Sequence, residues 1–220
     1  MAFDYEFSST TLAVNGRALH ARWARSFTRL DGETRPLPYG SAPWPAALAL
    51  LHGMGAASWN WSGARVVEVG CGIGLGAVFA AMQGARALAA DGHDDMARFV
   101  EANARLNGVD VEWRHWDHAR PPPDLGGVDV LLGSDLLYGA GQLNALLDTV
   151  DALVAGNARA LLADPGRRSL FDLVDRLRAR GFTVDHRTLS VDGSLLPGAS
   201  DVLAGHPPST GPCHLVEVRR

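Results

Sequence analysis

The sequence VVEVGCGIGLG, residues 66–76, decides the fold, because it joins an apolar, β-branched strand to a glycine-rich turn. Glycine adopts backbone conformations with positive φ and lets another group approach without a Cβ in the way. A helix is expected from Ala77 onward, and the first turn of a helix presents free N–H groups to a polar ligand. The stretch therefore predicts a strand, a ligand-binding turn and a helix in succession, with one acidic residue, Glu68, inside the strand.

Two classes of nucleotide cofactor bind at such turns. Dinucleotide enzymes place the pattern G-x-G-x-x-G/A under a pyrophosphate, and residues 72–77 fit that template imperfectly. Glu68 followed by Gly70, Gly72 and Gly74 instead resembles the first motif of the seven-strand S-adenosylmethionine (SAM) methyltransferases, whose ligand is a zwitterionic methionine at this turn. The pattern favours SAM over a dinucleotide, and a purely structural glycine turn is the remaining interpretation.

The composition is that of an ordinary soluble globule. The chain has 220 residues, of which 47% are hydrophobic and 20% charged, and this suits one domain with a full core of its own. The formal net charge is −4, so the chain lacks the basic surface that a nucleic-acid backbone requires. We expect a single-domain, monomeric protein that does not act on nucleic acid.

Cysteine content and the amino terminus bear on the compartment. Cys71 and Cys213 are the only cysteines, and a disulfide at Cys71 would interfere with a ligand at the glycine turn. This suggests a reducing compartment. The first residues contain neither a basic region nor an apolar run, and no later apolar run is long enough to span a membrane. The sequence therefore predicts a cytoplasmic protein without a membrane partner.

Strand and helix patterns alternate through the middle of the chain. Residues 3–30 alternate polar and apolar side chains around Asn15-Gly16, which predicts a β-hairpin. The alternation predicts an α/β fold: a Rossmann-like, mostly parallel seven-strand sheet with helices on both faces. We expect the last strand to be antiparallel, because a loop rather than a helix precedes it. The predicted division is a hairpin extension over 1–36, a SAM-binding core over 38–190 and a substrate-side loop over 191–212. The expected helices are 46–53, 77–83, 94–106, 141–153 and 169–180, and the expected strands are 65–69, 85–90, 109–114, 128–133, 158–163, 182–189 and 214–220.

Ligands of open α/β sheets bind beyond the carboxyl ends of the strands. Asp91 closes the second strand of the alternation, 21 positions after Gly70, where a carboxylate accepts hydrogen bonds from both ribose hydroxyls. Gly92 and His93 follow at the helix entry, close to the expected cofactor. The spacing indicates a ribose but suits NAD as well as SAM. A solvated aspartate that caps the next helix is the alternative.

The next two strand ends also carry polar side chains. Trp116 and Asp117 offer a flat apolar face and an acceptor, which suit an adenine ring and its exocyclic amine. The alternative is an aromatic side chain that covers the sheet edge. Ser134, Asp135 and Tyr138 follow the fourth strand, where Asp135 and Tyr138 would share one side of a turn at the mouth of the site. Otherwise Asp135 caps the next segment and Tyr138 packs.

Other chemistries find less support. Arg167 follows the turn-forming Pro165-Gly166 and offers a guanidinium that binds a carboxylate or phosphate, although a plain turn with a surface arginine fits equally well. His115 and His118 are three apart with only Asp117 beside them, so we expect no metal site. Neither cysteine has a base that the sequence places beside it, and no G-x-S-x-G turn occurs, so covalent catalysis has no sequence support.

These residues together resemble a branch of the class I, seven-strand methyltransferases: the protein-lysine methyltransferases that modify folded, non-histone proteins. The resemblance covers residues 38–190. Trp44-Pro45-Ala46 is similar to the W-P-A or W-P-G element that closes the cofactor pocket in that branch, residues 103–108 to its N-x-x-L-N-G, and Asp135-Leu136-Leu137-Tyr138 to its D-x-x-Y. Residues 163–167 resemble enzymes that methylate lysines of the electron-transfer flavoprotein β subunit, and bacterial relatives labelled nicotinamide N-methylase-like. The branch often has an acidic residue where this chain has His115.

The resemblance implies a SAM-dependent N-methyltransferase that methylates a lysine side chain of a protein by direct displacement. Asp135 would hold and orient the amine, and Tyr138 would wall its channel. The residues implied in cofactor binding are Trp44, Glu68, Gly70, Gly72, Gly74, Asp91, Gly92, His93, Trp116, Asp117 and Ser134. Two alternatives stay open: a methyltransferase of a small-molecule amine, with Arg167 and the 191–212 loop lining a closed pocket, and a non-catalytic SAM-fold module or dinucleotide enzyme.

Overall fold

The computed structural model describes residues 3–29, 38–120, 123–191 and 211–220. Their strands form a two-stranded and a seven-stranded sheet. The strands are β1 Phe3–Val14, β2 Arg17–Arg29, β3 Arg65–Val69, β4 Arg86–Asp91, β5 Glu112–His115, β6 Val130–Ser134, β7 Arg159–Asp164, β8 Thr183–Ser190 and β9 Pro212–Arg219. The helices are η1 Tyr39–Ser41, α1 Pro45–Ala56, α2 Leu75–Met82, α3 Met96–Leu106, α4 Gln142–Leu153 and α5 Arg168–Ala179.

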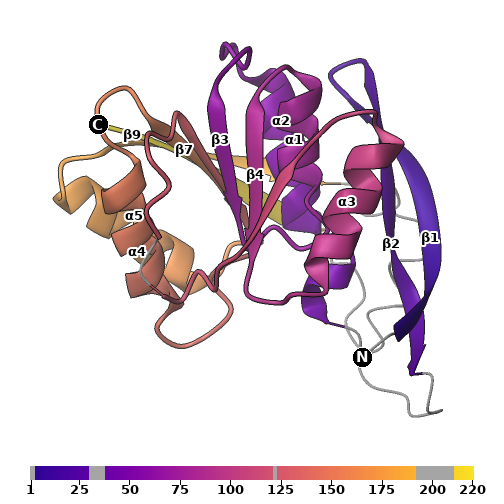
Figure 1. Ribbon diagram of the computed structural model, residues 1–220. Coiled ribbons are helices and arrows are strands. Elements are labelled where there is room, and N and C mark those ends of the chain that lie inside the picture. The colour runs from indigo at the N-terminus through magenta and orange to yellow at the C-terminus, as the bar shows by residue number, and fades with distance from the viewer. Residues whose placement is uncertain (1–2, 30–37, 121–122, 192–210) are drawn as a thin grey trace.

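The larger sheet has the strand order β5-β4-β3-β6-β7-β9-β8 (Figure 1). Strands β3 to β7 pair in parallel, whereas β9 pairs antiparallel with both β7 and β8. The order reverses between β3 and β6, so the turns after these two strands flank the switch point where ligands bind in open α/β sheets. The predicted α/β fold and its antiparallel last strand are confirmed.

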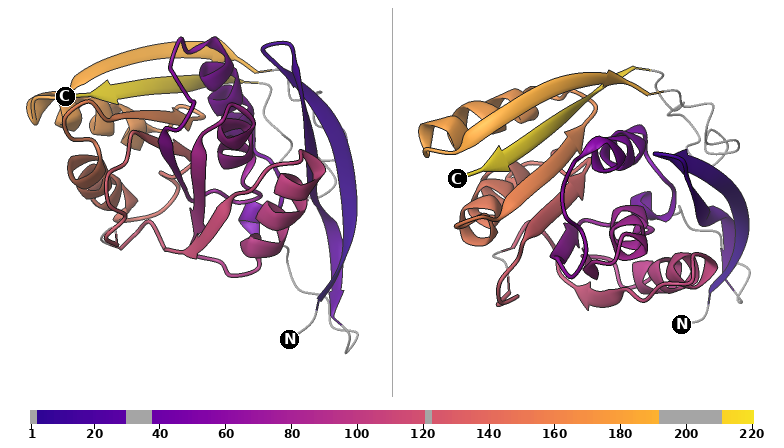
Figure 2. Two further views of the ribbon diagram at one scale, coloured as in Figure 1. Left: turned by 45° about the horizontal axis from the view of Figure 1, so that its top comes forward. Right: turned by 90° about the horizontal axis from the view of Figure 1, so that it is seen from above.

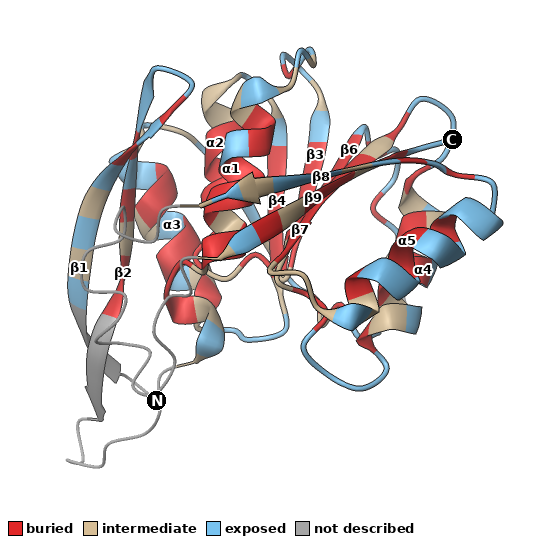
Figure 3. Ribbon diagram, turned by 180° about the vertical axis from the view of Figure 1, so that it is seen from behind, coloured by how far each residue is buried: buried red, intermediate tan, exposed pale blue. Residues whose placement is uncertain are grey.

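Helices cover both faces of this sheet (Figures 1 and 2). Helices α1, α2 and α3 lie on one face, where their apolar side chains pack with residues of β3, β6, β7 and β9. Helices α4 and α5 lie on the other face and pack against the opposite side chains of the same strands. The central strands are therefore buried on both sides, as Figure 3 shows, and this explains their nearly continuous apolar sequence.

The predicted hairpin is present and lies outside the helix layer, beside α3 (Figure 2). Two asparagines, one in α3 and one at its C-terminal end, attach the hairpin to that helix. The buried Asn103 amide accepts from Arg22 N at 2.7 Å and donates to Arg22 O at 3.0 Å, and Asn107 makes the matching pair of bonds with the backbone of His20. Asn103 also donates to the Ile73 carbonyl in the glycine turn at 2.9 Å. The 103–108 motif thus joins the hairpin to the turn after β3.

Several element boundaries differ from those expected. Helix α2 begins at Leu75 rather than Ala77, and α3 begins at Met96 rather than Asp94, because residues 92–95 form bends and turns. Most of the predicted 191–212 loop, residues 192–210, lies outside the described residues, as do Pro121 and Pro122. None of the helices described here is long and apolar enough to cross a membrane.

Candidate functional site

The turn after β3 is built from left-handed glycines. Gly70, Gly72 and Gly74 have φ of 55°, 51° and 76°, values that favour glycine. At Gly72 a Cβ would lie 2.7 Å from the Gly40 carbonyl oxygen, and at Gly74 it would lie 2.7 Å from Cγ2 of Val100. Neighbouring protein atoms therefore occupy the space that side chains would need, and the turn is packed from several sides.

Glu68 lies beneath this turn. Its side chain is buried, and Oε2 accepts a hydrogen bond from the Ala77 N–H at 2.8 Å. The carboxylate thereby fixes the first turn of α2, where free N–H groups would otherwise lack partners. Burial raises the pKa of Glu68 to about 7, against the opposing effect of the Ala77 and Gly76 N–H groups. Glu68 supports the glycine turn from inside the protein.

Residues 39–44 cover the glycine turn from the side of α1. Gly40 packs so closely on Gly72 that a Cβ on Gly40 would lie 3.0 Å from the Gly72 Cα. The Trp44 indole N–H donates to the Tyr39 carbonyl at 2.8 Å, and Pro45 then begins α1. Proline suits this position because its missing N–H has no helical partner there. Trp44-Pro45-Ala46 therefore holds the covering segment in place beside the turn.

Asp91 lies at the end of β4 and faces the same turn. Oδ2 accepts from Gly72 N and Oδ1 from His93 N, both at 2.9 Å. An ionised carboxylate has about four lone-pair positions, so each oxygen keeps acceptor capacity for a further donor. Gly92 packs against Asp117, because a Cβ there would lie 3.2 Å from the Asp117 Cα. The structure thus brings Asp91, Gly92, His93 and Asp117 together beside the glycine turn.

Trp116 is buried instead. Its ring packs into the core on the α4 and α5 side of the sheet, and its N–H donates to the Arg120 carbonyl at 3.3 Å. This arrangement corresponds to the alternative in which the aromatic covers the sheet edge, and it leaves Asp117 as the accessible member of the pair.

The turn after β6 carries the most unusual backbone of the site. Asp135 has φ of 57°, and in the described part of the chain only Asn15 of the hairpin turn is another non-glycine residue with positive φ. Ser134 ends β6, and Asp135 N donates to the Ala163 carbonyl at 2.9 Å. Leu136 packs against Gly70 and Gly133, where side chains would clash with it. These contacts hold Asp135 in place beside the turn after β3.

Tyr138 and His118 complete this edge. The Tyr138 side chain is 63% exposed, and its ring centroid lies 6.3 Å from that of the buried His118. His118 Nε2 lies 3.3 Å from the Leu136 carbonyl oxygen, and its ring also approaches Gly70. Sequence reasoning gave His118 no role, since its position between two turns depends on tertiary packing.

Arg167 pairs within the protein. Its guanidinium contacts the carboxylates of both Asp135 and Asp164, which lie at the ends of neighbouring strands. Asp164 Oδ1 also accepts from Gly166 N at 2.8 Å and Arg167 N at 2.7 Å. An aspartate followed two residues later by glycine is a turn signal, so the sequence did contain a clue to Asp164. Burial raises the pKa of the Asp135 carboxyl, and Arg167 opposes that shift.

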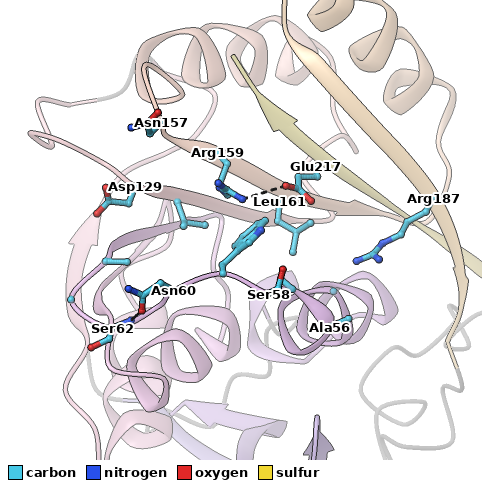
Figure 4. A pocket seen from close by; sticks show the side chains of 16 residues that line it. Ala56, Ser58, Asn60, Ser62, Asp129, Asn157, Arg159, Leu161, Arg187 and Glu217 are labelled. Carbon is cyan, nitrogen blue, oxygen red and sulfur yellow. Dashed lines mark hydrogen bonds and ion pairs between the residues drawn. The ribbon is translucent and has the colours of Figure 1, made fainter.

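A cavity of about 730 Å³ opens at the amino-terminal ends of the parallel strands, near the starts of β3, β6 and β7 (Figure 4). Ser58, Asn60, Arg159, Arg187 and Glu217 are among the residues that line it. Arg159 and Glu217 pair there at 3.7 Å. Because this cavity lies away from the carboxyl ends of the parallel strands, it is separate from the site around Asp91 and Asp135.

A family of proteins described as lysine methyltransferases matches residues 33–170. The chain belongs to this family. A protein N-lysine methyltransferase of Danio rerio, METTL21A, is 30% identical over 61% of this chain and 65% of its own length. A histone-arginine methyltransferase of Xenopus laevis, METTL23, is 32% identical over 53% of this chain and 52% of its own length. The chain thus spans about half to two thirds of these curated relatives.

The fold agrees with this family. A tRNA (uracil-54, C5)-methyltransferase of Pyrococcus abyssi, solved with S-adenosyl-L-homocysteine, superposes with a TM-score of 0.60. It is 8% identical, and the match covers 96% of this chain and 43% of that chain. The site suits SAM, since the partly buried Asp91 retains acceptor capacity next to the glycine turn, as a ribose-bearing cofactor requires. S-adenosyl-L-methionine is the cofactor that the family and these residues indicate.

Proposed function

We propose that the protein transfers a methyl group from S-adenosyl-L-methionine to the side-chain nitrogen of a lysine in a protein substrate. The observation that carries this proposal is the Asp135 carboxylate, 14% exposed, held at the end of β6 beside the turn that follows β3. Family membership supports the lysine as acceptor. When bound, SAM supplies an electrophilic methyl group: its carbon–sulfur bond breaks as a carbon–nitrogen bond forms, and S-adenosyl-L-homocysteine leaves.

On the cofactor side, we assign binding to the residues around the two neighbouring turns. Asp91 would accept from the ribose hydroxyls, and Asp117 would accept from the adenine amine beside Gly92. Gly70, Gly72 and Gly74 shape the turn against which the methionine end would lie, while Glu68 fixes the helix behind them. Trp44, His93 and Ser134 complete the proposed lining, and Trp116 supports it from the core.

On the acceptor side, the enzyme must bind the lysine side chain as an ammonium, and that group must lose a proton before it reacts as a neutral amine. A free lysine has a pKa of about 10.4, so it arrives protonated at neutral pH. We assign Asp135 to attract and orient that ammonium, and Tyr138 to form one wall of its path. The proton passes to solvent before transfer, and the alignment of the nitrogen with the methyl group supplies much of the rate.

Finer predictions belong with this proposal. From the resemblance of residues 163–167 we also propose a substrate related to the electron-transfer flavoprotein β subunit; the buried Asp164 and its pairing with Arg167 hold that motif in a defined turn. A cytoplasmic location and a monomeric state stay predictions.

The test is transfer of tritium-labelled methyl from SAM in an extract of the source organism, separated into protein and small-molecule fractions. The proposal expects label in a protein band, and none when Asp135→Asn replaces the wild-type enzyme. Label found only among small molecules would instead assign the enzyme to a metabolite amine.

A further inference from the structure

Three charged side chains meet beyond the ends of β6 and β7. The Asp135 side chain is 14% exposed, the Asp164 side chain 3% and the Arg167 side chain 34%. Nη1 of Arg167 contacts Asp135 Oδ1, and it lies 3.0 Å from Asp164 Oδ2. One guanidinium therefore serves two carboxylates that are both largely removed from water. Such an arrangement carries one negative charge when every group is ionised.

Asp164 anchors the arginine. Its Oδ1 accepts from two backbone N–H groups of the turn, and its Oδ2 accepts from the guanidinium, so both its oxygens have partners. Gly166, with φ of 94°, permits that turn. The guanidinium is thus fixed relative to β7 by the backbone as well as by charge. Asp135 accepts no comparable backbone hydrogen bond among the described contacts, and Arg167 is its principal counter-charge.

We propose that Arg167 is a positioning residue, held by Asp164, that keeps Asp135 ionised, so that the net negative charge of the site lies on the more exposed carboxylate, where it can bind a cationic alkylamine. This inference rests on the proposed function, because it assigns the substrate class of that site. Without Arg167, two buried carboxylates would face each other, and one of them would take up a proton near neutral pH. That proton would go to Asp135, which lacks the two backbone hydrogen bonds that Asp164 accepts.

Two other titratable groups near Asp135 do not replace the arginine. Tyr138 lies on the same turn and Cys213 on β9, and the pKa of each is raised by burial and by the neighbouring aspartates. Both are neutral at physiological pH, so neither supplies a positive charge. The site therefore favours an ammonium over a neutral alcohol of the same shape, and it disfavours a carboxylate-bearing acceptor.

The test compares Arg167→Gln, Arg167→Lys and a matched control, Arg180→Gln. Arg180 is also a half-exposed arginine shared by two aspartates, Asp148 and Asp151, but it lies at the end of α5. The first measurement is the pKa of Asp135, determined by an NMR titration of the carboxyl groups of isotope-labelled aspartate. We expect a rise of about one unit or more in Arg167→Gln, restoration in Arg167→Lys and no change in the control.

The second measurement is binding of butylammonium, which reproduces the end of a lysine side chain, with butanol as the neutral comparison. In the presence of S-adenosyl-L-homocysteine, the wild type should prefer butylammonium, and Arg167→Gln should lose that preference at least about tenfold near pH 7. The loss should shrink as the pH rises and Asp135 ionises again. A merely structural role for Arg167 would give a loss that does not depend on pH.

Two outcomes separate this inference from the proposed function. If the wild type methylates lysine but Arg167→Gln keeps the Asp135 pKa and the butylammonium preference, the inference is wrong and the function stands. If the wild type prefers butylammonium and Arg167→Gln loses the preference, yet no lysine is methylated, the inference stands alone. Should Arg167→Gln fail to fold, Asp164→Asn is the second variant. It keeps a side-chain oxygen that accepts from the backbone N–H groups and removes one negative charge. This variant should weaken butylammonium binding at least about tenfold.

Discussion

The turns after β3 and β6 lie side by side at the switch point, yet they reach the left-handed region in different ways. The turn after β3 uses three glycines, for which positive φ has no steric cost. The turn after β6 uses Asp135 at φ of 57°, where a residue with a Cβ is strained by about 1 kcal/mol. Glycine serves where a main chain must be closely approached, whereas a strained aspartate serves where a carboxylate is needed.

The carboxylates beside the two turns also differ in their exposure and in their partners. Behind the first turn, Glu68 is buried, and its carboxylate accepts a hydrogen bond from the first turn of α2. In the second turn, Asp135 keeps a partly exposed carboxylate whose main partner is Arg167. We therefore propose that the first turn has a structural role and the second a chemical one. Each of the following changes tests that distinction, from the largest expected effect to the smallest.

Asp135→Asn should lower the rate of methyl transfer at saturating SAM about a thousandfold, because it removes the charge that attracts and orients the ammonium. Asparagine tolerates the left-handed region as aspartate does, so the change removes charge and leaves the backbone. Titration should show unchanged SAM affinity. The control is Asp148→Asn on α4, an exposed aspartate that pairs with Arg180 and should keep full activity. Methyl transfer by Asp135→Asn at the wild-type rate would show that the turn after β6 also has only a structural role.

Glu68→Gln should remove a pH dependence of stability worth about 3 kcal/mol. Because the pKa of Glu68 rises from 4.5 to about 7 on folding, its protonated form is favoured in the native state. Stability is therefore fully present below 4.5 and is lost as the pH rises through 7. Denaturant unfolding of both proteins over this range gives the measurement. Parallel curves of unfolding free energy against pH would contradict the burial of an ionisable Glu68.

Gly72→Ala should destabilise the fold by about 2 kcal/mol and weaken SAM binding, because the new methyl group meets the Gly40 backbone. Gly63→Ala is the matched control, since Gly63 also has positive φ, at 73°, but nothing lies within 4 Å of a Cβ there. That control should cost about 1 kcal/mol, for conformation alone. Thermal unfolding and SAM titration of both variants provide the data. Equal losses would mean that close packing at Gly72 contributes nothing.

Asp135→Gly should raise the free energy of unfolding slightly, by less than about 1 kcal/mol, because glycine relieves the positive φ. Activity should nevertheless fall as far as in Asp135→Asn. Denaturant unfolding and the methyl-transfer assay are the two readouts. A clear loss of stability would indicate that the Asp135–Arg167 ion pair, rather than the function of the carboxylate, accounts for the strained residue.

Much of this architecture could be predicted from local sequence. Asn15-Gly16 indicates a two-residue hairpin turn, and the apolar runs at 66–69 and 130–132 indicate strands buried on both faces. The glycines at 70, 72 and 74 indicate a tight turn, since few other residues adopt positive φ without cost. These signals are local, so a single sequence contains them. The start of α2 does not follow from its local sequence, because the Glu68 carboxylate of β3 fixes an N–H group in the first turn of that helix.

The pairing of side chains could not be predicted in the same way. Arg167 was expected to bind a substrate anion or to lie on the surface, but the structure pairs it with Asp135 across two strands. Trp116 offered a flat face at the right strand end, yet it is buried in the core. His118 lies near Gly70 and Leu136 because the assembled sheet brings the turns after β3, β5 and β6 together. Each of these contacts depends on register between strands, which residue spacing along the chain does not specify.

The most direct test of the central claim identifies the amino acid that receives the methyl group. Protein labelled by the wild-type enzyme with tritiated SAM is hydrolysed to amino acids and separated, with Asp135→Asn as the blank. The account predicts methyl-lysine in the wild-type sample and none in the blank. Label in methyl-arginine, as the METTL23 relative would suggest, or label that persists in the blank would contradict it.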